Sequence, residues 1–190
     1  LRRQRQMCIR DRGYAAAVEN GYLYLGTNRG LYYTSYPVKL NGSLPDIHPV
    51  PQSSGQVWNL CKIGDDLFCL HDRGIFQIKG TSIHRITDIT GAWCCQEVMG
   101  RPDRMFVGVY NGIYLLEKKA GEWHMLGKIE GFVDSSRLFE QESARILWVH
   151  NSGIITRVEL SEDLTRQISV KSYGVAEGFP VERDIYVAKI

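Results

Sequence analysis

A twelve-residue pattern that occurs four times constrains the fold of this chain more than any other feature. The copies read LYLGTNRGLYYT from Leu23, LFCLHDRGIFQI from Leu67, MFVGVYNGIYLL from Met105 and ILWVHNSGIITR from Ile146. Each copy has a glycine seven residues after its first apolar residue, and these glycines (Gly30, Gly74, Gly112 and Gly153) are 44, 38 and 41 residues apart. Repetition at a period of about 40 residues is typical of propellers and other repeat folds, so we expect a series of similar units.

Each copy predicts a β-hairpin. Three apolar residues come first, then turn formers such as Asn28-Arg29-Gly30 and Asp72-Arg73-Gly74, and then a second apolar run. Asn and Asp tolerate left-handed backbone and Gly supplies positive φ, so these residues suit a tight turn. We expect the four repeat glycines to occupy equivalent hairpin turns.

Weaker strand signals flank the hairpins. They lie upstream at residues 57–61, 93–98 and 137–139 and downstream at 82–86 and 122–125, with polar turns expected at 64–66, 100–103 and 141–143. This gives about four strands per repeat, which is typical of a propeller blade. The sequence therefore predicts an all-β protein, a β-propeller with about four blades of four antiparallel strands. The hairpins lie near 22–36, 66–79, 104–117 and 145–158.

The first twelve residues differ from the rest of the chain. They carry five Arg and one Asp, a net charge of +4, whereas the whole chain carries +2 and residues 13–190 therefore −2. They show no strand alternation, and no apolar segment of a signal peptide follows the arginines. We interpret residues 1–12 as a non-native or disordered leader; the alternative is a basic arm for nucleic acid or a lipid surface. No apolar run of about 18 residues is present, so we expect no membrane span in this segment.

Residues 22–33, YLYLGTNRGLYY, resemble the repeat of the two-component regulator propeller family. The later copies are degenerate, because Leu70-His71, Gly108-Val109 and Val149-His150 replace the Gly-Thr of that repeat. Gly178-Phe179-Pro180 resembles the turn that begins the family's repeat, so residues 173–190 are expected to open a further blade.

The resemblance implies a function. Members of this family are membrane-anchored regulators with a periplasmic sensor propeller, and their output is a histidine kinase or a helix-turn-helix domain. Their rings have more than four blades, so we expect this chain to be an incomplete ring from a larger protein. Its partners would be neighbouring blades and downstream domains of that parent, with no direct nucleic acid contact by this segment.

The polar residues form no recognisable catalytic motif. The carboxylates of Asp65, Asp66, Glu97, Asp103 and Asp134 are scattered over turns and strands. His71 and His150 occupy the same position of the repeat and are expected at the surface beside their turns, too few for a metal site. The five cysteines contain no C-x-x-C, and we interpret them as small buried hydrophobes. We predict no catalytic residue, no metal and no cofactor.

Aromatic side chains are the remaining candidates for ligand contacts. Trp58, Trp93, Trp123 and Trp148 are interpreted first as core between blades, with Trp93 and Trp123 as the more exposable pair. Together with Tyr110 these two are the candidate ligand-binding residues, because aromatic faces stack on sugar rings. Two functions stay open. One is a non-catalytic propeller that recognises an oligosaccharide, another small ligand or a protein partner; the other is a fragment of a carbohydrate-active lyase or glycosidase.

Overall fold

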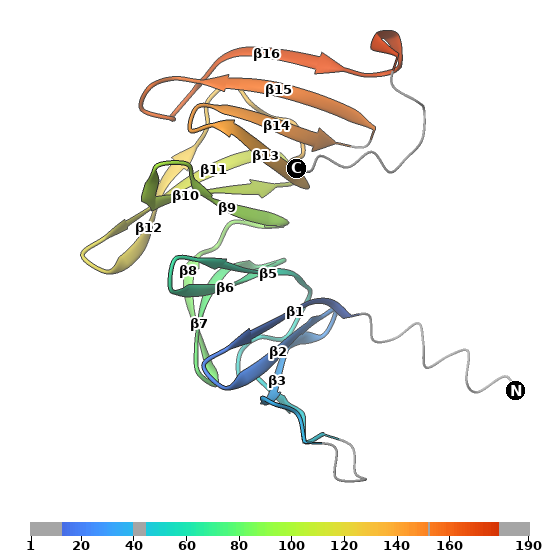
Figure 1. Cartoon of the computed structure of the whole chain (residues 1–190), viewed down its shortest axis with the longest axis vertical. Coiled ribbons are helices and arrows are strands. Elements are labelled where there is room, and N and C mark those ends of the chain that lie inside the picture. The colour runs from blue at the N-terminus through green and yellow to red at the C-terminus, as the bar shows by residue number, and fades with distance from the viewer. Residues whose placement is uncertain (1–12, 40–44, 152, 179–190) are drawn as a thin grey trace, which may run out of the picture. The chain divides into compact units, whose positions relative to one another are not determined.

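Four separate antiparallel sheets make up the computed structural model, which describes residues 13–39, 45–151 and 153–178 (Figure 1). Each sheet has four strands, and strands that follow one another in the chain are neighbours in the sheet. This meander of four strands is the structure of a propeller blade. The expectation of an all-β fold built from four-stranded blades is confirmed.

The first two sheets come from residues 13–87. Their strands are β1 (Gly13–Glu19), β2 (Tyr22–Thr27), β3 (Gly30–Ser35), β4 (His48–Pro49), β5 (Val57–Ile63), β6 (Asp66–His71), β7 (Gly74–Lys79) and β8 (Ser82–Thr87).

The third and fourth sheets come from residues 94–173. Their strands are β9 (Cys94–Val98), β10 (Arg101–Val109), β11 (Gly112–Lys119), β12 (Glu122–Lys128), β13 (Leu138–Ser143), β14 (Ile146–Asn151), β15 (Ile154–Leu160) and β16 (Gln167–Tyr173), followed by the short 3₁₀ helix η1 (Val175–Glu177).

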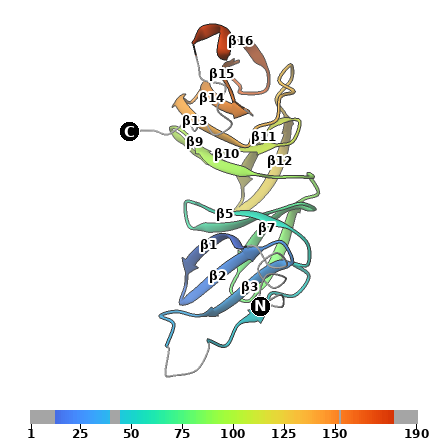
Figure 2. The same cartoon turned by 90° about the vertical axis from the view of Figure 1, so that its right-hand side faces the viewer.

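The chain divides into two compact units, Leu1–Gly91 and Ala92–Ile190. In the first unit, sheets one and two bury a shared apolar cluster that includes Tyr24, Leu31, Cys69 and Phe76. Figure 2 shows β5 of the second sheet alongside β1 of the first. The Tyr24 hydroxyl also donates a hydrogen bond of 2.9 Å to the carbonyl of Gly80, in the β7–β8 turn, and so ties the two sheets together.

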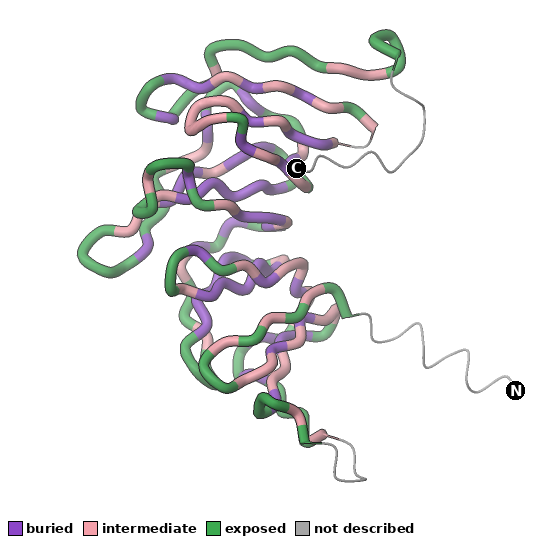
Figure 3. The backbone as a smooth tube through the Cα atoms, viewed as in Figure 1, coloured by how far each residue is buried: buried purple, intermediate pink, exposed green. Residues whose placement is uncertain are grey.

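The second unit is built in the same way from sheets three and four. The rings of Phe106 and Phe139 meet edge to face at 6.4 Å between centroids, within a buried cluster shared by both sheets. Gln141 also links the sheets, because its side chain donates to the carbonyl of Glu97 at 2.7 Å and accepts from the amide of Met99 at 3.0 Å. In Figure 3 buried residues are concentrated in strands such as β6, β7 and β10, whereas the residues of β16 are largely exposed.

Close packing of the backbone, more than the hairpin turn itself, requires three of the repeat glycines. Gly30, Gly74 and Gly112 are the first residues of β3, β7 and β11, and their φ values are +144°, +142° and +148°. A Cβ on Gly74 would lie 2.2 Å from the carbonyl oxygen of Thr87, and one on Gly30 would lie 2.8 Å from that of Ser53. The segment that leaves each blade passes directly over the glycine, so a side chain has no room.

The fourth hairpin departs from the predicted alignment. Thr27 pairs with Gly30 in the first hairpin, but in the fourth Asn151 pairs with Ile154, so Gly153 lies inside the turn, with φ of +87°. The prediction of four equivalent glycines is therefore wrong for Gly153. A slip of one residue turns every side chain of a strand to the opposite face.

The slip also moves His150 out of register with His71. By strand pairing, His150 is equivalent to Leu70, and Asn151 is equivalent to His71. The expectation that the two histidines share one repeat position is wrong for this reason.

Two of the expected polar turns are strand instead. Residues 101–103 begin β10 after a turn at Met99-Gly100, and residues 141–143 end β13. Register shifts between Arg101 and Met105 and between Gln141 and Ser143 accommodate these polar residues within the strands, which the sequence pattern did not indicate.

Some expectations fall outside the described residues. These are the leader 1–12 and, of the further blade expected at 173–190, residues 179–190; Tyr173 ends β16. Among the residues described, no helix is long and apolar enough to cross a membrane. The incomplete ring stays a prediction.

Candidate ligand-recognition site

Two of the three candidate ligand residues lie together at one end of the third sheet. Trp93 directly precedes β9, and its amide donates to the carbonyl of Gly108 at 2.9 Å. Tyr110 follows β10, the neighbouring strand, in the turn to β11. Their rings meet edge to face with centroids 5.3 Å apart. Trp93 is half-buried and Tyr110 is 43% exposed, so solvent reaches the pair.

Arg137 completes this group from the fourth sheet. It directly precedes β13, it is exposed, and its Cζ lies 4.6 Å from the centroid of the Trp93 ring. Gly108 makes this approach possible, because a Cβ there would lie 2.2 Å from the carbonyl oxygen of Ser136. The amide of Ser136 in turn donates to Val109 at 2.9 Å, which fixes the segment that carries Arg137.

We call Trp93, Tyr110 and Arg137 the Trp93 cluster. The guanidinium over the indole is held by a cation–π attraction, and its planar donors suit carboxylate or phosphate oxygens. The aromatic rings offer apolar contact area beside a phenol hydroxyl. This combination suits a ligand with an apolar ring face and an acidic group. The sequence did not indicate Arg137, because it is distant from Trp93 in the chain and the signal that brings them together is Gly108.

Trp123 takes no part in such a site. It is 4% exposed on β12, where it pairs with Lys118 of β11. The expectation that Trp123 is one of the more exposable tryptophans is wrong, because the alternation of β12 turns its ring inward.

The other two tryptophans lie in separate aromatic contacts. Trp58 lies 5.8 Å from the ring of Tyr14 in the first unit. Trp148 stacks at 5.7 Å on Tyr173 of β16, and its indole nitrogen donates to Glu142 at 2.8 Å. Hydrogen bonds from Arg157 and then from Trp148 hold the pKa of the exposed Glu142 carboxyl below its usual value.

The two candidate histidines, His71 and His150, are not at the surface. His71 is fully buried and His150 is 8% exposed, which corrects the expectation of surface residues beside turns. Burial, and then the charge of Arg73, lower the pKa of His71. No group of three or more His, Cys, Asp or Glu that could hold a metal ion occurs among the residues the structure describes.

The remaining polar candidates do not converge. Asp65, Glu97, Asp103 and Asp134 are exposed, and Asp66 accepts a hydrogen bond of 2.8 Å from Gln77 within its own sheet. The free thiols of Cys69 and Cys94 are buried, and burial raises the pKa of each to about 12. They are inert packing groups, as expected for small hydrophobes.

No model of a protein family matches the sequence, and no curated protein matches it.

Proposed function

We propose that this chain is a ligand-recognition propeller segment without chemistry of its own. It would belong to the periplasmic sensor of a membrane-anchored regulator of the two-component regulator propeller type. The observation that carries the recognition role is the Trp93 cluster, in which loop residues of two sheets bring an indole, a phenol and a guanidinium together at an exposed position. The assignment to a sensor rests on the resemblance of residues 22–33 to the repeat of that family.

Loops at the ends of a rigid sheet are common places for binding residues. Trp93, Tyr110 and Arg137 fit this arrangement, because each lies directly before or after a strand and none lies inside one. Main-chain hydrogen bonds at Trp93 and at Ser136, next to Arg137, hold these segments, and Tyr110 and Arg137 lie outside the strands, so changes of these two residues should alter the surface and not the ladder. The cluster favours an oligosaccharide that carries a uronate, since the sugar ring would contact the aromatic faces and the carboxylate would meet Arg137.

Calorimetric titration with neutral and uronate-containing oligosaccharides tests the recognition role. We expect a uronate-containing oligosaccharide to bind, and Tyr110→Ala and Arg137→Ala each to weaken its binding at least tenfold. Tyr14→Ala is the matched control, since Tyr14 is 41% exposed and Tyr110 is 43% exposed. The absence of binding across both panels, or equal loss in the control, contradicts the proposal.

Product analysis separates this function from the carbohydrate-active enzyme. A sensor returns every bound oligosaccharide unchanged, whereas a lyase or glycosidase shortens it. The regulator assignment is tested by the sequence of the complete gene. We expect a transmembrane segment with a histidine kinase or helix-turn-helix domain, and an adjoining catalytic carbohydrate-active domain would contradict it.

A further inference from the structure

Lys128 lies beside the turn that carries Tyr110. It is the last residue of β12, and its side chain crosses Gly112, the first residue of β11. A Cβ on Gly112 would lie 2.6 Å from Cε and 3.5 Å from Nζ of Lys128. Over the equivalent glycines of the first two sheets, Gly30 and Gly74, the nearest atoms are main-chain oxygens. Of these three sheets, the third alone has a charged side chain over its hairpin glycine.

Main-chain pairing fixes the direction of this side chain. Lys128 pairs with Tyr114 of β11, and the next residue, Ile129, donates its amide to the carbonyl of Ile113 at 2.9 Å. A lysine stem packs along the protein surface while its ammonium stays in water. Lys128 is half-buried in this way, so its ammonium lies beside the β10–β11 turn.

Lys128 and Arg137 have no acidic partner within the described part of the chain. Neither side chain forms an ion pair or a hydrogen bond there, and the one contact of the Arg137 guanidinium is with the Trp93 ring. The segment between the two cations carries the exposed carboxylates of Glu130 and Asp134, which pair with neither. Both cations are therefore available to an acidic ligand.

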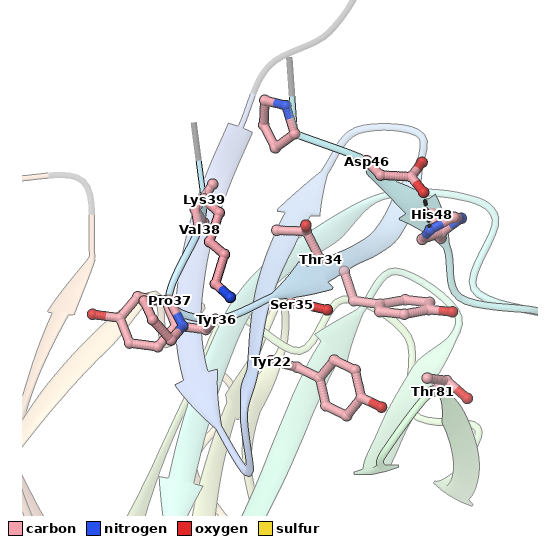
Figure 4. A pocket seen from close by; sticks show the side chains of 12 residues that line it. Tyr22, Thr34, Ser35, Tyr36, Pro37, Val38, Lys39, Asp46, His48 and Thr81 are labelled. Carbon is pink, nitrogen blue, oxygen red and sulfur yellow. Dashed lines mark ion pairs between the residues drawn. The ribbon is translucent and has the colours of Figure 1, made fainter. Parts of the chain in front are cut away.

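The surface around Lys128 is made by described residues throughout. It is bounded by β12, by the segment 129–137 and by β13. The groove of about 740 Å³ in the first unit (Figure 4) differs in this respect, because its lining residues Lys39 and Pro45 flank positions outside the described residues.

The Trp93 cluster and Lys128 form a row along one end of the third sheet. Trp93 directly precedes β9, Tyr110 lies in the β10–β11 turn, and the Lys128 ammonium lies over the start of β11. The strand order is β12-β11-β10-β9, so two strand spacings separate β9 from β11. At a spacing of about 4.8 Å, the two ends of the row are about 10 Å apart. Asn111, exposed in the same turn, lies between them.

Given the recognition role proposed for the Trp93 cluster, on which this step depends, we propose that Lys128 is a second anion-binding residue of the same site. The ligand is then an acidic oligosaccharide with carboxylates on two different sugar units. One carboxylate meets Arg137, the sugar between lies against Tyr110, and the second carboxylate meets Lys128. A single uronate is too short to reach both cations.

The distance between the cations favours an oligosaccharide over a compact dianion. A phosphate ion would contact only one of two cations that lie about 10 Å apart. The amide of Asn111 between them is both a donor and an acceptor, which suits sugar hydroxyls. The planar donors of Arg137 orient one carboxylate, whereas the point charge of Lys128 accepts the second in several orientations.

Calorimetric titration of the full chain with oligogalacturonates of one to four units tests this length requirement. We expect the affinity to increase about tenfold from the monomer to the tetramer, because only the longer oligomers reach Lys128. Methyl esterification removes the carboxylate charges and should abolish this increase.

Matched variants isolate the ammonium group. Lys128→Met keeps an unbranched stem over Gly112, so it should weaken binding of the tetramer about fivefold and leave the monomer unchanged. Lys128→Arg should bind both as the unchanged chain does. Lys119→Met is the control, since Lys119 is exposed at the opposite end of β11. Circular dichroism establishes that each variant is folded.

The outcomes separate Lys128 from the recognition role itself. If the tetramer binds and Arg137→Ala weakens it, but Lys128→Met binds it normally or affinity does not rise with length, Lys128 is not part of the site and the recognition role stands. If no oligogalacturonate binds, or Arg137→Ala binds normally, the recognition role is wrong and the Lys128 subsite with it.

Discussion

Thr27 and His71 occupy the same position of their hairpins and accept the same hydrogen bond. The amide of Arg29 donates to the Thr27 hydroxyl at 3.1 Å, and the amide of Arg73 donates to Nδ1 of His71 at 2.9 Å. Each side chain thereby satisfies the amide two residues later in the turn. The second copy of the repeat has lost the Gly-Thr sequence but keeps the interaction that stabilises the turn.

The hydrogen bonds of His71 determine which tautomer its neutral ring adopts. Nδ1 accepts from Arg73, so the proton of the neutral ring is on Nε2, which donates to the carbonyl of Ser53 at 3.3 Å. Burial is the largest cause of its lowered pKa, and the Arg73 charge is the second. The imidazolium form would lose the hydrogen bond from Arg73.

The first prediction concerns stability against pH. Because the pKa of His71 is lower in the folded than in the unfolded chain, the unfolded chain binds the proton more readily. The stabilisation from neutral His71 is complete above the unfolded pKa of about 6.5 and is lost as pH falls through the folded pKa. Urea unfolding between pH 7.5 and 5 should show this decline, and it should be smaller in His71→Gln, which keeps an acceptor and a donor. An identical pH profile in the variant would contradict the assignment.

The second prediction concerns the repeat glycines. Gly74→Ala should lower the free energy of unfolding by about 2–4 kcal/mol, because φ is +142° and the added Cβ would meet the Thr87 carbonyl. Gly80→Ala is the control, since φ there is +56° and nothing lies within 4 Å of the added Cβ. It should cost about 1 kcal/mol from backbone strain alone. Equal losses in urea unfolding would show that packing against Thr87 does not matter.

The hairpins could be predicted from the sequence because their apolar runs and turn residues are local. β1 could not, since its alanines carry little strand preference, and β16 offers only the short alternation of Ile168 and Val170 with polar residues. The offset of the fourth hairpin was not indicated by the repeat, because the repeat aligns Asn151 with the turn residues Asn28 and Asp72, whereas Asn151 ends a strand and pairs with Ile154. Trp93 and Tyr110 were identified as candidates, but their contact with Arg137 depends on the packing of Ser136 over Gly108, which is a tertiary feature.

The third prediction concerns thiol reactivity. Cys69 and Cys94 should resist iodoacetamide at pH 8 in the folded chain and react once urea unfolds it. With a pKa of about 12, only about one thiol in ten thousand is ionised at pH 8, and both side chains are buried. Peptide mass mapping before and after unfolding gives the extent of labelling at each cysteine. Labelling of either residue in the folded chain at the rate of an unfolded peptide would show that its sheet opens readily.

The last prediction concerns the outer face of the first sheet. Leu23, Leu25 and Tyr32 are partly exposed there, and Val18 is 48% exposed. Their counterparts in the second sheet, including Leu67 and Cys69, are 4% and 0% exposed, and they belong to the cluster shared with the first sheet. The outer face of the first sheet thus has the apolar character of a face that another sheet covers.

An uncovered apolar sheet face promotes association in solution. We expect the chain to self-associate as its concentration rises, in sedimentation velocity and light scattering, and to bind a hydrophobic dye. Leu25→Glu should weaken both, because it places a charge at the centre of the face. Ile168→Glu is the control, since Ile168 is 56% exposed on β16 of the fourth sheet and is not part of this face. A monodisperse monomer at every concentration, or equal effects of the two variants, would show that this face is not the association surface.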